Sequence, residues 1–178
     1  MKAIGVILFL SVLAVKSHGG SPHKVTLSTF NIKWFGVGGA MWNDPSQEFR
    51  QESIGRFVRE ELGDSDVIVF SEIVKTETLK QVVAPKWECV TYEGAWSRHQ
   101  HTMICYKPKK FRVEKYDTDY IIPEVSLGSG GQRPATQAKL CHLKGKCFLQ
   151  ILGVHLAAGK KTEKRKKHIN RLSIGICS

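Results

Sequence analysis

The sequence lacks a hydrophobic run long enough to cross a membrane as a helix. Its longest apolar stretch, Ala3 to Val15, is shorter than the roughly 20 residues that a spanning helix needs. The stretch follows Lys2 and precedes the small residues at Ser17 to Gly19, an order typical of a secretory signal peptide. We therefore predict a signal peptide at residues 1–19, a secreted protein (extracellular or periplasmic) and no stable membrane insertion. An uncleaved anchor is the alternative reading.

Acidic side chains are also scarce. The chain has 27 Lys and Arg residues against 16 Asp and Glu residues, a net charge of +11. Lys2 and Lys16 carry only two of these charges, so the basic excess belongs to residues 20–178. A basic chain suits a polyanionic partner such as nucleic acid or anionic lipid, and charge alone does not choose between them.

The five cysteines follow no CxxC or Cys/His spacing, which argues against structural zinc. In an exported chain, cysteines favour disulfides. Cys141 and Cys147 flank a short loop that can set them opposite each other, and we predict a bridge between them; two unbonded buried thiols are the alternative. Cys89 and Cys105 lie in two strand-like runs that can form a second facing pair.

Residues 20–178 contain no repeat, low-complexity tract or linker, so we predict one layered α/β domain. A helix is expected to open at Asp44 to Gln47, with Asp44 as its cap, and to bury a stripe of Phe49, Ile54, Val58 and Leu62. A second helix is expected at 76–83, and a basic one from Lys161. The expected strands are 24–35, 66–70, 88–92, 102–106, 111–116, 135–142 and 147–156.

Three apolar runs within or next to these strands are closed by a polar residue: Asn31 follows 25–30, Glu72 follows 67–70 and His155 follows 148–154. Open sheets gather binding groups at strand ends, and this set suits a hard divalent cation at Glu72 and a phosphate at the other two. Each residue also has a simpler explanation. Asn31 can bond a neighbouring turn, Glu72 can cap the next helix, and His155 can be a satisfied, half-buried histidine.

Four segments extend the pattern. They are TLSTFNIKWFG (26–36), DVIVFSEI (66–73), QRPATQAKL (132–140) and ILGVHLAAG (151–159). In this order they resemble the endonuclease/exonuclease/phosphatase superfamily. The resemblance implies a DNase I-like four-layer α/β (α+β) sandwich and a metal-dependent hydrolase.

The resemblance also implies roles for the strand-end residues. Glu72 matches the superfamily's ligand for catalytic Mg2+ or Mn2+, with Ca2+ a further candidate, and Asn31 matches the Asn of the same metal and phosphate region. His155 matches the first catalytic His, which acts beside the scissile phosphate.

Three further residues are implied to bind substrate. Arg133 matches an Arg of the substrate cleft, and Lys33 a basic position that touches the DNA backbone. Gln100 lies where DNase I has a Glu that pairs with the first catalytic His; an amide can orient an imidazole but cannot stabilise its charge as a carboxylate does.

Two other motifs of the superfamily are missing: an Asp-x-Asn motif and a Ser-Asp-His motif with the second catalytic His. After His155 the only acidic residue is Glu163. We therefore expect residues 20–178 to be the N-terminal part of such a domain, truncated and inactive as given. The basic segment Lys160 to Arg171 suits contact with a phosphate backbone, or equally a solvated helix face.

These features together predict a secreted, divalent-metal-dependent phosphodiesterase, specifically a DNA endonuclease. A secreted phosphatase or sphingomyelinase-type phosphodiesterase is the first alternative. A non-catalytic, cationic nucleic-acid-binding remnant is the second. The sequence leaves the oligomeric state open.

Overall fold

The computed structural model describes residues 24–37, 46–91, 100–117, 127–128, 131–132, 136–145 and 147–154. The predicted signal peptide, Arg133, His155 and the basic segment Lys160 to Arg171 lie outside these residues.

The first sheet contains four strands in the order β1-β2-β4-β3. β1 (Leu27–Phe35) runs parallel to β2 (Val67–Ile73), and the two are connected through α1 (Gln47–Glu60). β4 (His101–Tyr106) is antiparallel to both β2 and the edge strand β3 (Glu88–Thr91), which follows α2 (Thr76–Val83). Parallel strands need a crossover connection, and α1 forms it between β1 and β2.

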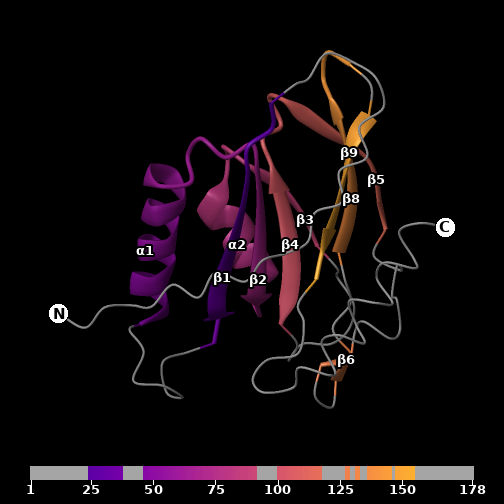
Figure 1. Ribbon diagram of the computed structural model, residues 1–178. Helices are drawn as coiled ribbons and strands as arrows, with labels where there is room; N and C mark the ends of the chain where they lie inside the picture. Colours follow the sequence, from indigo (N-terminus) through magenta and orange to yellow (C-terminus); the bar gives the residue numbers. More distant parts are fainter. Residues whose placement is uncertain are drawn as a thin grey trace.

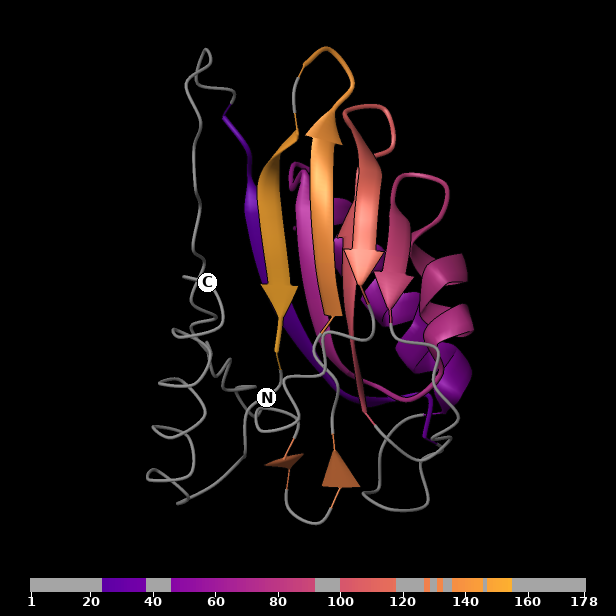
Figure 2. The same cartoon turned by 90° about the vertical axis from the view of Figure 1, so that its right-hand side faces the viewer.

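The second sheet is antiparallel, with the order β5-β8-β9. Its strands are β5 (Phe111–Asp117), β8 (Thr136–His142) and β9 (Cys147–Gly153). A short pair, β6 (Leu127–Gly128) and β7 (Gly131–Gln132), lies apart from it. The two helices cover one face of the first sheet and the second sheet covers the other (Figures 1 and 2). The described residues therefore form three layers of the predicted sandwich: the two helices, the first sheet and the second sheet.

Strand β2 lies between two hydrophobic cores. Ile68 and Phe70 face the helices, where they join Val58 and Leu79. Val67 and Val69 face the second sheet and join its buried aliphatic residues Ala138, Leu140, Leu149 and Ile151. This arrangement confirms the prediction that the run at 66–70 is buried on both faces.

Two sequence predictions about α1 are wrong. The helix begins at Gln47, and its N-cap is Ser46, whose Oγ accepts a hydrogen bond from Phe49 N at 3.3 Å, so Asp44 is not the cap. Phe49 is 57% exposed and does not join the predicted buried stripe, whereas Val58 of the same helix is fully buried in the core.

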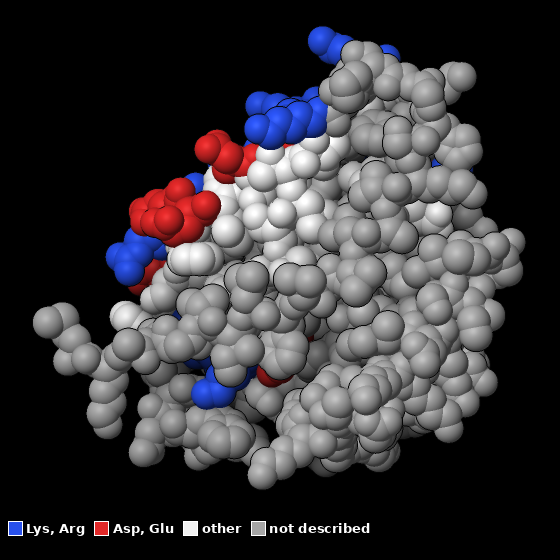
Figure 3. Space-filling view, in the orientation of Figure 1, with Lys and Arg blue, Asp and Glu red and all other residues white. Residues whose placement is uncertain are grey.

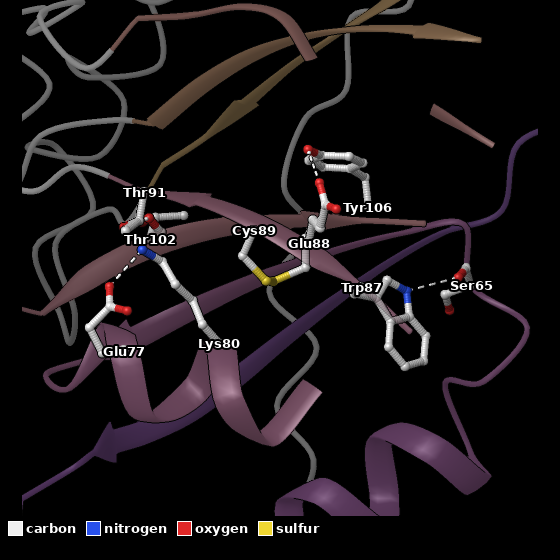
Figure 4. Close-up of a disulfide and its surroundings, with 10 residues drawn as sticks. Ser65, Glu77, Lys80, Trp87, Glu88, Cys89, Thr91, Thr102 and Tyr106 are labelled. Atoms are coloured by element: carbon white, nitrogen blue, oxygen red, sulfur yellow. Dashed lines mark hydrogen bonds and ion pairs between the residues drawn. A yellow bond between two sulfur atoms is a disulfide. The ribbon is translucent and has the colours of Figure 1, made fainter. Parts of the chain in front are cut away.

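A disulfide joins Cys89 to Cys105, as the facing strand runs predicted. The two residues are opposite each other in the antiparallel pairing of β3 with β4 (Figure 4). On the same two strands, the Tyr106 hydroxyl donates to Glu88 Oε2 at 2.9 Å. Burial and this negative neighbour raise the pKa of Tyr106 to about 12.

Cys141 is also disulfide-bonded, and the pairing of β8 with β9 sets it opposite Cys147. The bridge between these two residues stays a prediction. Within the described part of the chain, no helix is long and apolar enough to cross a membrane.

Candidate active site

The carboxylate of Glu72 is the centre of the candidate site. Asn31 Nδ2, from β1, donates a hydrogen bond to Glu72 Oε1 at 2.8 Å. Gln100 Nε2, from the residue before β4, donates to Glu72 Oε2 at 3.0 Å. The structure thus brings together three of the predicted site residues, from β1, from β2 and from the residue before β4.

The backbone is irregular where these residues lie. The pairing of β1 with β2 shifts register between Asn31 and Phe35, and that of β2 with β4 shifts between Phe70 and Ile73. The first strand ends at Phe35, as predicted, whereas the second continues beyond the predicted end at Phe70 to Ile73. Bulges of this kind re-aim side chains and are common next to active sites.

Three residues at this irregularity adopt left-handed backbone conformations. Their φ angles are 37° at Lys33, 55° at Trp34 and 64° at Glu72. Residues with a Cβ rarely adopt this region, and each instance costs on the order of 1–3 kcal/mol. Such strain gathers at sites where the surrounding structure enforces it, which supports a functional role for this end of the sheet.

Asn31 is held by its own turn as well as by Glu72. Its Oδ1 accepts a hydrogen bond from Lys33 N at 2.9 Å, and this bond fixes which end of the amide points to the carboxylate. The simpler explanation, that Asn31 bonds a neighbouring turn, is therefore also correct. The corresponding explanation for Glu72 is wrong, because α2 begins after Lys75 with no side-chain cap.

Gln100 is 4% exposed, so its amide reaches Glu72 from inside the protein. The resemblance implied that Gln100 orients His155, and it gave no signal for the bond to Glu72. A buried amide with a fixed donor is well suited to setting the orientation of a carboxylate.

The end of β9 lies beside these residues. A Cβ atom placed on Gly153 would lie 2.6 Å from Thr102 Cγ2, so the two sheets approach closely at this glycine. The Thr102 carbonyl, two residues after Gln100, also accepts a hydrogen bond from Thr136 Oγ1 at 2.7 Å. The last described residues of this segment, Gly153 and Val154, therefore lie towards the Glu72 end of the first sheet, and His155 follows them in the sequence. The positions of His155 and Arg133 lie outside the described residues.

The donor set at Glu72 fits a hard divalent cation. Carboxylate oxygens are ligands that such cations prefer, and the amides of Asn31 and Gln100 orient those of Glu72. In the described part of the chain there is no cluster of three or more His, Cys, Asp or Glu side chains. One carboxylate suits Mg2+, which keeps several waters and binds substrate phosphates, better than it suits zinc, which requires three or four protein ligands.

Comparisons with known proteins place this geometry in a fold. No protein-family model matches the sequence, and no curated protein matches it. Among solved structures, an endonuclease/exonuclease/phosphatase family protein from Bacteroides thetaiotaomicron matches with a TM-score of 0.65 over 88% of this chain, at 14% identity. The chain has the endonuclease/exonuclease/phosphatase fold. The fold class predicted from the sequence is thereby confirmed.

Two further structures with the endonuclease/exonuclease/phosphatase fold match over 86% of this chain. Mannosyl-6-phosphatase from B. thetaiotaomicron matches with a TM-score of 0.62 at 14% identity. TDP2 from Danio rerio, solved with a single-strand DNA product, matches with a TM-score of 0.62 at 13% identity. The chain covers 58%, 59% and 55% of the lengths of these three structures.

Proposed function

We propose that this chain forms the metal-binding part of a secreted, divalent-metal-dependent phosphodiesterase that acts on DNA. The observation that carries the proposal is the Glu72 carboxylate held by Asn31 and Gln100 at one end of the first sheet. The fold supports a phosphoester substrate, because two of the similar structures are a sugar phosphatase and TDP2 bound to a DNA product.

Each described residue has a distinct task in this proposal. Glu72 holds Mg2+ or Mn2+, and the amides of Asn31 and Gln100 keep its oxygens oriented towards the ion. The ion would supply positive charge next to the phosphoryl group during hydrolysis. Lys33 is exposed beside Asn31, where its ammonium group is suited to contact the DNA backbone.

His155 and Arg133 complete the proposed site. In this proposal His155 stabilises charge that develops at the phosphate, and Arg133 binds a phosphate oxygen. The close packing of Gly153 against Thr102 supports the placement of the β9 end near Glu72.

DNA is the proposed substrate because of the charge of the chain. The net charge of +11 favours a polyanion over a small phosphate ester. The contacts are not expected along the outer side of α1, where Figure 3 shows acidic and basic side chains interspersed. A phosphatase remains the second candidate, since mannosyl-6-phosphatase is among the similar structures.

Secretion is supported by the signal-like segment at residues 1–19 and by the disulfide of Cys89 with Cys105. Disulfides persist in oxidising compartments and are rare in the cytosol. N-terminal sequencing of the exported protein would test the proposal, and a new N-terminus at residue 20 is the expected result.

The function is tested by plasmid nicking in Mg2+, in EDTA and over a salt series, with the complete enzyme of which residues 20–178 are, in this proposal, the N-terminal part. We expect nicking that EDTA abolishes and that salt weakens steeply. Glu72→Gln should lower the rate by about 100-fold or more, because the ligand charge is lost. The matched control is Glu77→Gln, which alters an exposed carboxylate paired with Lys80 and should have no effect.

Other outcomes choose between the alternatives. Cleavage that is insensitive to EDTA would contradict the proposal. Hydrolysis of phosphomonoesters or phosphocholine lipids without nicking would favour the phosphatase or sphingomyelinase-type alternative. Salt-dependent DNA binding without turnover would favour the non-catalytic alternative.

A further inference from the structure

The backbone turn at residues 32–37 accepts hydrogen bonds from side chains of α1. Arg50, in the first part of α1, donates from one guanidinium nitrogen, Nη2, to Ile32 O at 3.0 Å and to Lys33 O at 2.7 Å. The side chain of Gln47, three residues earlier on the helix, donates to Val37 O. The start of α1 thus bonds both ends of this turn.

The other side of the turn is docked on the end of β2. Phe35 O accepts hydrogen bonds from Val74 N at 2.8 Å and from Lys75 N at 3.2 Å. Gly36 has a φ of 96°, and a Cβ atom there would lie 2.6 Å from Lys75 Cβ. Only glycine allows this approach without displacing the backbone.

The held turn contains the left-handed residues Lys33 and Trp34. Strained conformations of this kind persist only where neighbouring contacts enforce them. Arg50 donates to the carbonyl oxygens of Ile32 and Lys33, so its hydrogen bonds act directly on the strained peptides. Hydrogen bonds from a charged donor are about twice as strong as neutral ones, which makes the guanidinium the strongest of these contacts.

The strained turn is coupled to the candidate site through one further bond. Lys33 N, in the same turn, donates to Asn31 Oδ1, and Asn31 Nδ2 then donates to Glu72. A continuous path of hydrogen bonds therefore leads from the Arg50 guanidinium through the backbone of Lys33 to the Glu72 carboxylate.

We infer that Arg50 is a positioning residue: by clamping the left-handed turn at Lys33 and Trp34, it keeps Asn31 directed at Glu72. The effect of the clamp on metal binding and cleavage rests on the proposed function. The effect on the turn itself does not, so the two are tested separately.

The first test measures how well the turn is held, by the hydrogen exchange of the Lys33 amide. In Arg50→Met, the amide proton of Lys33 is expected to exchange with solvent about tenfold faster or more by NMR, because its bond to Asn31 loosens when the clamp is lost. The matched control is Arg56→Met, which changes an exposed arginine of the same helix and should leave this exchange rate unchanged. Millimolar guanidinium ion should restore protection in Arg50→Ala by occupying the vacated space.

The second test measures the metal affinity and the activity of the candidate site. Titration with Mn2+, followed by electron paramagnetic resonance, should show an affinity about 10- to 100-fold weaker in Arg50→Met, the range found when residues that orient a metal ligand are changed. In the nicking assay, kcat should fall more than KM rises, because the inferred role of Arg50 is to orient Asn31 and not to bind DNA. Arg50→Lys, which retains one charged nitrogen with a shorter reach, should be intermediate in both readouts and serves if the methionine variant does not fold.

Different results overturn different statements. If Arg50→Met, or Arg50→Lys in its place, is folded and exchanges Lys33 at the wild-type rate, Arg50 is not a clamp. If Lys33 exchange is unchanged while DNA affinity falls, Arg50 acts on the substrate and the inference is wrong. If Lys33 exchange rises but the wild-type protein binds no Mn2+, the clamp stands and the proposed function fails.

Discussion

Two carboxylates lie near opposite ends of β2, and their partners differ. Asp66, just before the strand, is 2% exposed and is bound by the ammonium groups of Lys110 at 2.6 Å and Lys107 at 3.7 Å. Glu72, near the other end, is bound by the side-chain amides of Asn31 and Gln100. The first pairing brings two positive charges to one negative charge, whereas the two amide donors at Glu72 are neutral.

The difference separates a structural carboxylate from a candidate functional one. Burial raises the pKa of Asp66, but hydrogen bonds from Lys110 and Thr26 N, with the charges of Lys110 and Lys107, outweigh it and hold the pKa below its usual value. This ion pair ties the turn after β4 to the start of β2. The amides of Asn31 and Gln100, by contrast, are neutral donors, and they orient the Glu72 carboxylate.

The comparison predicts that the regular part of the first sheet maintains stability and the irregular end maintains the site. The largest expected effect is that of the Cys89→Ala/Cys105→Ala double variant. Loss of a bridge with a sequence separation of 16 should lower the free energy of unfolding by about 3 kcal/mol, measured by urea denaturation. Mn2+ affinity of the folded variant should stay within about twofold of wild type. A large loss of affinity without a loss of stability would reverse the assignment.

Asp66→Asn should have the next largest effect. The variant loses charge-assisted hydrogen bonds at a buried position, but Lys110 is 48% exposed in its side chain and can turn to water. We expect a loss of about 2 kcal/mol in the free energy of unfolding, with Mn2+ binding retained. Glu72→Gln is the matched variant and should show the opposite pattern: a change below about 0.5 kcal/mol in stability and loss of Mn2+ binding. Equal destabilisation of both variants would remove the distinction between the two carboxylates.

Gln100→Met sharpens the comparison at the site itself. Removing the donor to Glu72 Oε2 should weaken Mn2+ binding by about tenfold, because the carboxylate loses one of its two orienting bonds. Thr91→Val is the control. It removes a buried hydrogen bond to Thr102 O on the same strand pair, and should lower stability without changing Mn2+ affinity. Equal affinity in Gln100→Met and wild type would show that Gln100 does not orient the ligand.

The smallest expected effect is the loss of the Asp66 contribution to stability at low pH. Because the pKa of Asp66 is lowered from 3.8 on folding, its contribution to stability is fully present above that value and is lost as the pH falls through the folded pKa. The stability difference between wild type and Asp66→Asn should therefore be smaller at about pH 3 than at neutral pH. Urea midpoints at both pH values measure it. A difference that grows in acid would contradict the sign of the shift.

Much of the fold was predictable because it depends on local periodicity. The helix Thr76–Val83, the doubly buried run at Val67 to Phe70 and the facing pair Cys89 and Cys105 all match the structure. The meeting of Asn31 and Glu72 was also predictable, since β1 and β2 are parallel and their ends lie at the same edge.

Other features of the site were not predictable, because they depend on contacts between distant elements. Lys33, Trp34 and Glu72 are not residue types that signal a left-handed backbone, so their conformations are enforced by tertiary structure. The Arg50 bonds span the helix and the strand, and nothing in the local sequence marks them. The bond of Gln100 to Glu72 likewise requires β4 to lie beside β2.

Among the described strands, β1 is at an edge of its sheet, where unpaired backbone groups invite another chain to add a strand. The left-handed residues Lys33 and Trp34 break the straight run of these groups, and Arg50 takes up two of the carbonyls that an incoming strand would need. The turn that aims Asn31 therefore also interrupts this edge of the described sheet, and we expect variants that relax it to aggregate more readily as well as to bind metal less tightly.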